Sequence, residues 1–383
     1  MSRTSRMSPR ERMMTAMRNG KPDRVPVAPD ISNMIPARMT GKPFWDIYLR
    51  DDPPIWKAYL DAVDRLGIDG WFIYADMGYR YPGGRSEAAA EIVETEDRKV
   101  VTWKGRRSGL AYDHKWTYYR SDSPTLTRKA VRDLDRQWDL VEAFLAPPVA
   151  YDPTLLRGQR RLLGERGAFG VHVCYPGLQN WPYVWLDGGI EKAAEWYADR
   201  HDRILEIRDM QDRMLAVEME MVLDERPDFV ILGGSGTITL QGPVIARELC
   251  LPSIKRLTRM AKQAGVTIML HSCGRERELV QMCYEETDLD CINPVEGPPM
   301  GDCDLAEIKK TFGHRLSFMG NLHTTDVMLF GTRETVREAS RKAIEAAGAN
   351  GGFILSTGDQ CGRDTPDANI RAMIEAAEEF GRY

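Results

Sequence analysis

The sequence of 383 residues lacks any apolar run of about 18 residues, so we expect no membrane-spanning helix and no membrane partner. It shows no signal peptide pattern, and we expect a cytoplasmic protein. The seven cysteines follow no regular spacing and form no disulfide framework of the secreted kind, so their thiols are free to bind metal. The formal net charge of −5 excludes the basic excess of a nucleic-acid-binding protein, and we expect no nucleic acid partner.

Short apolar runs alternate with amphipathic segments along most of the chain. Strands are predicted at residues 25–29, 69–74, 168–174, 228–232, 266–271, 291–295, 316–320 and 352–356. Helices are predicted at 53–66, 129–145, 189–224, 243–264, 275–286, 304–312, 332–347 and 366–381. This alternation indicates an α/β protein whose eight parallel strands close into a (β/α)8 TIM barrel. No glycine-rich dinucleotide fingerprint follows the first strand, which disfavours a doubly wound open sheet.

Two segments depart from this alternation. Residues 8–19 read as an amphipathic helix capped by Ser8, and we expect this N-terminal segment (1–20) to pack on the outer wall of the barrel. Residues 79–125 contain period-two runs separated by charged turns, which predicts an antiparallel β excursion inserted in the barrel. We therefore expect one domain over residues 1–383 that carries this insertion.

The most informative stretch is the predicted strand that ends in His271-Ser272-Cys273-Gly274. Side chains two residues apart in an extended backbone point the same way, so the imidazole and the thiol can approach a common point. Cys361 follows the last apolar run and is the best candidate for a third metal ligand. Imidazole and thiolate are zinc ligands, and three protein ligands leave one position open for catalysis. Cys291 and Cys303 are less favoured candidates for metal ligands.

Further polar and aromatic side chains follow the predicted strands, at the end where barrel enzymes form their active sites. They are Asp76, Tyr175, Gln179, Asn180, Trp181, Glu296, Asn321, His323, Asp359 and Gln360. Asp76 is either a loop cap or a catalytic base, and His323 is either a structural polar residue or part of the site. Three roles are open for Glu296: a further metal ligand, a residue that orients His271, or a surface charge. The aromatic loop 175–185 is either lid packing or a site for a flat aromatic ligand or a cobalamin-carrying partner.

Several of these stretches carry a family resemblance. In order and spacing, residues 228–234, 251–256, 271–274, 291–295, 304–308, 318–322, 351–356 and 365–370 resemble the uroporphyrinogen decarboxylase superfamily. More narrowly they resemble its cobalamin-dependent methyltransferase branch, in which a His-x-Cys pair and a late cysteine bind zinc. The resemblance covers the second half of the chain and is looser in the first half. It implies a (β/α)8 barrel with zinc ligands at His271, Cys273 and Cys361.

The decarboxylase branch is matched less well. Its arginine-rich motif near the first strand, which grips the acidic side chains of a porphyrinogen, is absent from residues 26–38, although Arg38 is nearby. Asp76 does match the aspartate that contacts pyrrole nitrogens in that branch. Ser235 stands where the superfamily often has an acidic residue, so substrate contacts are not carried over.

These observations predict a zinc-dependent methyltransferase that moves a methyl group between a small substrate and the cobalt of a corrinoid. The chain has no Asp-x-His-x-x-Gly pattern, so the cobalamin is expected on a partner corrinoid protein. Asp76, Glu296 and His323 are the catalytic candidates, and Tyr175, Asn180 and Trp181 are candidates for contact with the corrinoid cofactor. The aromatic loop favours an aromatic methyl ether as donor, with O-demethylation as the reaction. Two alternatives stay open: a metal-free decarboxylase of a porphyrinogen or other acid, and a non-catalytic corrinoid-binding barrel.

Overall fold

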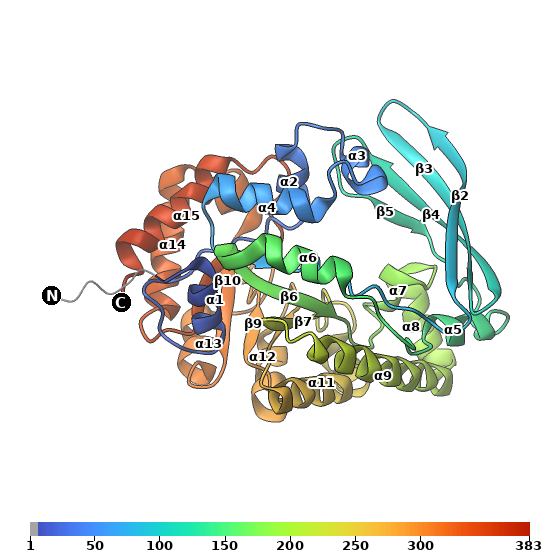
Figure 1. Cartoon of the computed structure of the whole chain (residues 1–383). Helices are drawn as coiled ribbons and strands as arrows, with labels where there is room; N and C mark the ends of the chain where they lie inside the picture. Colours follow the sequence, from blue (N-terminus) through green and yellow to red (C-terminus); the bar gives the residue numbers. More distant parts are fainter. Residues whose placement is uncertain (1–6) are drawn as a thin grey trace.

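The computed structural model describes residues 7–383 and is built around one parallel sheet (Figure 1). Its seven strands are neighbours in the order in which they occur in the chain, so the sheet winds in a single direction. They are β1 (Gly70–Phe72), β6 (Gly167–Val173), β7 (Phe229–Gly233), β8 (Thr267–His271), β9 (Cys291–Asn293), β10 (Ser317–Leu322) and β11 (Phe353–Thr357). The predicted α/β class and the parallel sheet are confirmed.

The eighth predicted strand, at residues 25–29, is wrong as a regular strand. Val27 forms one isolated parallel bridge with Leu355 of β11, and its carbonyl accepts the Asp69 N–H just before β1. The segment therefore lies between the first and last strands of the sheet. Pro26 and Pro29 lack the N–H groups that a regular hydrogen-bonded ladder needs, which explains why no longer pairing forms.

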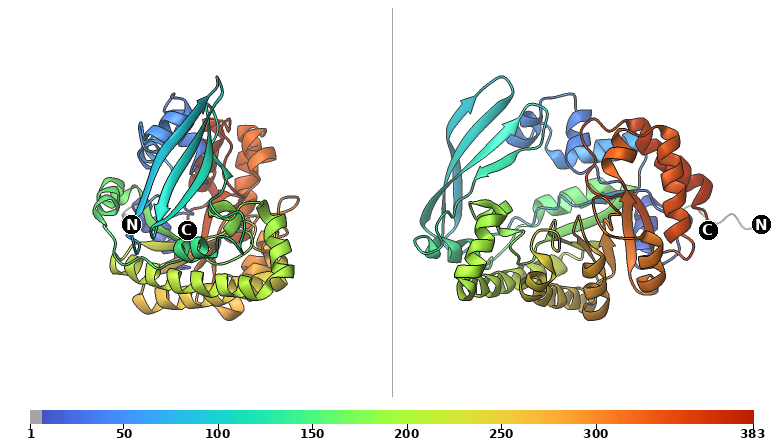
Figure 2. Two further views of the ribbon diagram at one scale, coloured as in Figure 1. Left: turned by 90° about the vertical axis from the view of Figure 1, so that its right-hand side faces the viewer. Right: turned by 180° about the vertical axis from the view of Figure 1, so that it is seen from behind.

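Helices follow most strands and surround the sheet (Figures 1 and 2). They are α2 (Met34–Met39), α3 (Phe44–Arg50), α4 (Ile55–Leu66), α5 (Trp138–Phe144), α6 (Thr154–Leu163), α7 (Trp181–Val184), α8 (Gly189–Asp199), α9 (His201–Asp224), α10 (Gly242–Leu249), α11 (Leu251–Ala264), α12 (Arg277–Glu286), α13 (Leu305–Phe312), α14 (Arg333–Ala347) and α15 (Asp367–Phe380). Short η1 (Gly164–Arg166) and η2 (Thr324–Leu329) complete the set. Among residues 7–383, none of these helices has the length and apolar character needed to cross a membrane.

Three helix predictions are corrected. The helix expected at 243–264 is interrupted at Cys250, between α10 and α11. The helix expected at 129–145 is only α5, because the Asp133 carboxylate accepts the N–H groups of Asp135 and Arg136 and holds a turn there. The helix expected at 189–224 is broken at Arg200 into α8 and α9.

The N-terminal helix α1 (Pro9–Met17) lies at the N-terminal ends of the strands, not on the outer wall as predicted. Ser8 caps it as expected, and its side chain accepts the Glu11 N–H. Its buried side chains are Met13, Met14, Ala16 and Met17. They pack in one cluster with Ala28 and with side chains that the strands contribute: Trp71, Ala168, Phe229, Ile231, Met269, Cys291, Met319 and Ile354. The helix therefore covers the inner surface of the sheet at one end because its methionines complete this cluster.

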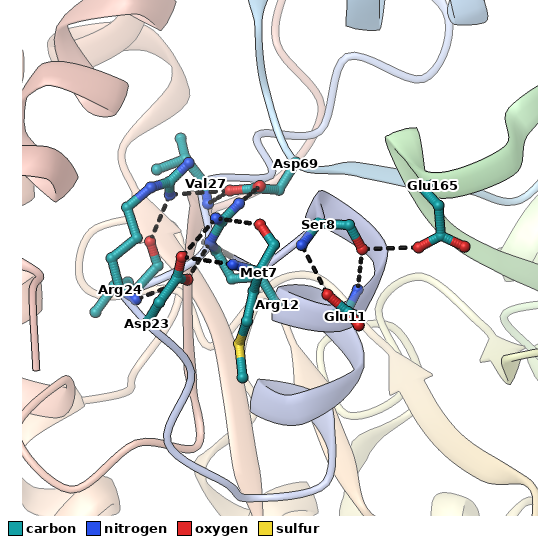
Figure 3. A network of polar contacts seen from close by, with 10 residues as sticks. Met7, Ser8, Glu11, Arg12, Asp23, Arg24, Val27, Asp69 and Glu165 are labelled. Carbon is teal, nitrogen blue, oxygen red and sulfur yellow. Dashed lines mark hydrogen bonds and ion pairs between the residues drawn. The ribbon is translucent and has the colours of Figure 1, made fainter. Parts of the chain in front are cut away.

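A polar network fixes α1 to that end of the sheet (Figure 3). The Asp69 carboxylate accepts hydrogen bonds from the Arg12 guanidinium at 2.5 Å, the Arg24 guanidinium at 3.0 Å and the Val27 N–H at 2.9 Å. Arg12 also pairs with Asp23 at 2.7 Å. Asp69 is 1% exposed, so its charge is stabilised by these partners rather than by water.

The predicted insertion is confirmed as a separate antiparallel sheet of four strands. These are β2 (Arg85–Glu94), β3 (Arg98–Arg107), β4 (Leu110–Tyr119) and β5 (Thr125–Arg128). Figures 1 and 2 show this sheet at the end of the molecule opposite α1, beyond the C-terminal ends of the parallel strands. It thus stands at the end where the candidate site residues lie.

Candidate metal centre

Strand β8 ends at His271, and Cys273 follows two residues later and faces the same space. Ser272 between them is fully buried, and its hydroxyl accepts the Thr237 N–H at 3.1 Å, while its own N–H donates to the Asn293 carbonyl. Alternation along the extended backbone therefore turns the imidazole and the thiol away from the core and toward a common space.

The loop after β11 adds a third donor to this space. One ligand atom from each of His271, Cys273 and Asp359 lies within 4.8 Å of the other two. The Asp359 carboxylate is 4.0 Å from His271 Nε2. A nitrogen, a sulfur and an oxygen at this separation are a donor set that a divalent ion such as zinc can bridge.

His271 is oriented by Asn293 on the neighbouring strand β9. Its Nδ1 lies 2.7 Å from Asn293 Oδ1, and the Asn293 amide is itself held because its Nδ2 donates to the Met319 carbonyl. Since Oδ1 can only accept, Nδ1 carries the hydrogen and Nε2 keeps its lone pair. The imidazole therefore presents the nitrogen that a metal would bind, with the other nitrogen fixed by a partner.

The Cys273 thiol lies in an environment that disfavours a free thiolate. Burial raises the pKa of Cys273 to about 12, and the Asp359 charge adds to this, while a contact with Ser235 acts in the opposite direction. A partly buried thiolate near carboxylates needs a cation beside it. The chemistry of this donor set therefore fits a bound metal ion.

Cys361, the third predicted ligand, lies outside the group that His271, Cys273 and Asp359 form. Its side chain is fully buried, its N–H donates to the Asp30 carbonyl at 2.8 Å, and the Thr357 hydroxyl contacts the thiol. Burial raises the pKa of Cys361 to about 12. The structure thus brings together two of the three predicted ligands, and the ligand role of Cys361 stays a prediction.

Glu296 lies beside the group. Its Oε2 accepts the Gly274 N–H at 2.5 Å, and Gly274 has φ +91°, a conformation that glycine adopts freely. Its side chain also packs close to Gly358, which precedes Asp359. Burial and the Asp359 charge raise the pKa of Glu296, whereas the Gly274 hydrogen bond lowers it. Glu296 therefore connects the loops that carry Cys273 and Asp359.

Asp30 and His172 were not predicted as site residues. The Asp30 carboxyl is almost fully buried, its pKa is raised by burial, and the charges of His271 and Asp359 act on it. Its place directly after the predicted strand at residues 25–29 is the feature of the sequence that could have identified Asp30 as a site residue. His172 on β6 is open to solvent, but protein surrounds its ring closely enough to lower its pKa to about 4. A Cβ atom on residue 233 would lie only 2.0 Å from His172 Nε2. The glycine at this position therefore leaves the space that the His172 ring occupies.

Asp76 and His323 lie outside the group of three. Asp76 is exposed after β1, and its carboxylate accepts the Gly78 N–H, as a loop cap would. His323 Nδ1 accepts the N–H groups of Thr325 and Asp326 at the start of η2, whereas its buried Nε2 has no hydrogen-bond partner among the described residues. This nitrogen lies 3.9 Å from the Asp326 carboxylate, and the catalytic roles of Asp76 and His323 stay predictions.

The three candidates for corrinoid contact follow β6. Tyr175 is fully buried, and its hydroxyl bonds the Thr237 hydroxyl at 2.5 Å and the Gly234 carbonyl at 3.1 Å. The Asn180 amide donates to the Tyr175 carbonyl, and the Trp181 indole donates to Gln211 at 2.6 Å. Asn180 and Trp181 line a cavity beneath the antiparallel sheet. Tyr175 is held by packing, and the predicted corrinoid contacts stay predictions.

The parallel sheet and the metal-ligand group at the C-terminal ends of its strands define an α/β protein with a candidate metal centre. The family model described as "Uroporphyrinogen decarboxylase (URO-D)" matches residues 188–380, just over half of the chain. The chain therefore belongs to the uroporphyrinogen decarboxylase family, as the sequence resemblance implied.

Curated relatives point to the methyltransferases of this family. The chain is 29% identical over 133 residues to a methylated-thiol–coenzyme M methyltransferase of Methanosarcina mazei, covering 35% of the chain and 32% of that protein. It is 26% identical over 174 residues to the methylcobamide:CoM methyltransferase MtbA of the same organism, covering 45% and 47%. A uroporphyrinogen decarboxylase of Anaeromyxobacter dehalogenans is 25% identical over 137 residues, covering 35% and 36%. In each case the chain spans less than half the length of the relative.

A solved structure extends the fold comparison to the whole chain. A methyltransferase from Methanosarcina mazei superposes with a TM-score of 0.65, covering 98% of this chain and 99% of that one, at 15% sequence identity. At this identity the similarity concerns the fold. The resemblance to the family and to its corrinoid methyltransferases is confirmed.

Proposed function

We propose that this protein is a zinc-dependent methyltransferase that exchanges a methyl group between a small substrate and a corrinoid carried by a partner protein. The observation that supports it most is the convergence of His271, Cys273 and Asp359 within 4.8 Å, in a chain whose relatives include methylcobamide:CoM methyltransferases. In this proposal, residues 25–29 complete a (β/α)8 barrel, and the site lies at its open end.

His271 Nε2 and the Cys273 thiolate hold the metal, and the loop after β11 supplies the next ligand. In the present conformation of this loop, the Asp359 carboxylate lies beside His271 and Cys273. Cys361 would have to turn its thiol away from Thr357 to bind the same metal. Zinc supplies Lewis acidity, so a thiol held there is kept as thiolate or an ether oxygen is polarised. Asn293 holds the His271 ring in place throughout.

The remaining polar groups manage protons and orientation. Burial and the Asp359 charge raise the pKa of Glu296, and its carboxyl group is the one that we propose passes a proton to a leaving oxygen or sulfur. His323 offers the substrate its Nε2–H, which makes no hydrogen bond and lies 3.9 Å from the Asp326 carboxylate. Asp76, which is exposed at the rim, is the third proton carrier in the proposal.

The corrinoid arrives on a partner protein in this account, and we keep Tyr175, Asn180 and Trp181 as the residues proposed to contact it. An aromatic methyl ether is the donor that we favour, because the loop of residues 175–185 is rich in aromatic side chains. The reaction would then be O-demethylation.

The test is spectroscopic. The zinc-loaded protein is mixed with cob(I)alamin and a series of methyl ethers, thioethers and methylamines, and the visible spectrum is followed. We expect conversion to methylcobalamin with at least one donor, and no conversion with the His271→Ala variant. Absence of conversion with every donor class would contradict the proposal.

The alternative of porphyrinogen decarboxylation has one observation in its favour, the similarity to uroporphyrinogen decarboxylases. Against it, the arginine-rich motif is missing, and Arg38 is already paired with Asp367. Carbon dioxide release that is undiminished in Cys361→Ser would support that alternative.

A further inference from the structure

A cavity of ≈ 540 Å³, partly open to solvent, lies between the antiparallel sheet and the helices α5, α7 and α9. This sheet cavity is lined by none of the metal-centre residues His271, Cys273 and Asp359. Its size suits a small organic molecule. It is therefore a second place where this protein can hold a ligand.

The sheet side of the cavity is built by strand alternation. Alternate residues of β2, β3 and β4 face the same way, and their register places Arg85 opposite Arg107 and Tyr112 opposite Gly105. A Cβ on Gly105 would come within 2.7 Å of the Tyr112 ring, so the glycine lets that ring lie flat on the sheet. The side chains that reach the cavity from this face are Arg85, Glu87, Arg107, Tyr112, His114 and Trp116.

The opposite side is helical. Gln211, Met214, Leu215 and Glu218 of α9 recur at helical spacing and line the cavity together. Trp181 and Trp185 add two tilted indole rings whose centroids are 6.2 Å apart. Aromatic walls on two sides match a flat ring, because stacked and edge-to-face contacts both become available.

Arg107 contributes a buried guanidinium group to the wall of the cavity. Its side chain is 5% exposed, its Nε and Nη2 donate to the carbonyls of Ala143 and Phe144, and the guanidinium carbon lies 3.8 Å from the centre of the Tyr81 ring. No ion pair in the described part of the chain includes it. A buried guanidinium without a carboxylate partner favours an anionic ligand, and its planar fork matches a carboxylate.

The charges around Arg107 do not neutralise it. Arg85 and His114 are within ion-pair distance of Glu87, whose carboxylate also accepts the Tyr112 hydroxyl at 2.7 Å. Burial raises the pKa of Glu218 to about 7, against the opposing effect of Arg107, so this carboxyl is largely protonated in slightly acidic solution. A protonated Glu218 can donate a hydrogen bond to a carboxylate that Arg107 holds.

We propose that the sheet cavity binds a planar aromatic carboxylic acid, with the ring between the tryptophan and tyrosine side chains and the carboxylate on Arg107. This binding needs neither the metal nor the corrinoid.

Three tryptophans line the cavity, so binding is measured by quenching of intrinsic fluorescence in the full-length protein. Titration with benzoate is compared with benzamide, which keeps the ring without the charge, and with cyclohexanecarboxylate, which keeps the charge without the aromatic ring. We expect saturable quenching by benzoate and at least about tenfold weaker binding of the other two.

Arg107→Gln should weaken benzoate binding by about tenfold or more, whereas Glu218→Gln, which keeps a donor, should bind at least as tightly as the wild type. Because Arg107 also holds the end of α5, Trp116→Leu serves as a second variant that removes a cavity wall and should weaken binding too. His271→Ala should bind benzoate like the wild type, whatever becomes of the proposed methyl transfer. Benzoate that binds no better than benzamide, or equally well to Arg107→Gln, would overturn the inference.

Discussion

His271 Nδ1 lies 2.7 Å from Asn293 Oδ1, and this contact determines which imidazole nitrogen faces the candidate metal centre. Without it the ring could rotate or change tautomer. We therefore predict that Asn293→Ala lowers the affinity for zinc by about 10- to 100-fold without removing any ligand. A competition titration against a chelating dye measures this affinity.

The matched control is Asn369→Ala, because the Asn369 amide is also buried and donates to backbone carbonyls, those of Met328 and Gly331. It should bind zinc like the wild type. Equal affinities of the Asn293 variant and the wild type would show that the ring needs no such partner.

The zinc affinities of two variants show which residue supplies the third protein ligand. Zinc prefers thiolate to carboxylate, so we expect Cys361→Ser to lower zinc affinity by at least about tenfold and Asp359→Asn to have the smaller effect. This result requires that the Cys361 thiol turns out of the core when the metal binds. The opposite ranking would assign the ligand set to His271, Cys273 and Asp359, the group that is already assembled.

Glu218 makes stability depend on pH. Its pKa is raised from 4.5 to about 7 mainly by burial, so the folded state disfavours its charged form. Stability contributed by the neutral form is complete below about pH 4.5 and is lost as the pH rises through about 7. Glu218→Gln stays neutral, so its melting temperature should match that of the wild type near pH 4.5 and exceed it near pH 8. A constant difference across this range would contradict the assignment.

The network at the other end of the sheet is expected to support folding rather than the site (Figure 3). Asp69→Ala leaves Arg12 and Arg24 without their shared buried carboxylate and should lower the free energy of unfolding by about 3–5 kcal/mol. Glu165→Ala removes an exposed carboxylate that pairs with Arg10 and should change it by less than about 1 kcal/mol. Denaturant unfolding monitored by circular dichroism measures both, and equal effects would contradict the assigned role of Asp69.

Periodicity in the sequence predicted much of the fold. Seven of the eight strands and the antiparallel insertion were placed correctly, because apolar runs and period-two alternation depend only on neighbouring residues. The strand at residues 25–29 was wrong because its composition is apolar, while its prolines remove the hydrogen-bond donors that a strand needs. The place of α1 was also wrong, since its methionines suit an outer wall as well as the inner cluster that they complete.

The site was predicted in part for a similar reason. The approach of His271 and Cys273 follows from local strand geometry, so the sequence could reveal it. Asp359, and not Cys361, lies in the group with His271 and Cys273 because of how the loop after β11 turns, which no local pattern specifies. His172 and Asp30 lie near enough to His271 for its charge to act on them. This proximity depends on which strands are neighbours in the sheet, so only the structure showed it.

Zinc content is the most direct test of the account. The protein is purified without added metal, dialysed, and analysed by inductively coupled plasma mass spectrometry beside His271→Ala and the exposed-histidine control His314→Gln. We predict a stoichiometric amount of zinc in the wild type and in His314→Gln, and almost none in His271→Ala. A wild-type protein that neither carries zinc nor takes it up on titration, or a His271→Ala variant that keeps it, would contradict the metal centre on which the proposed function depends.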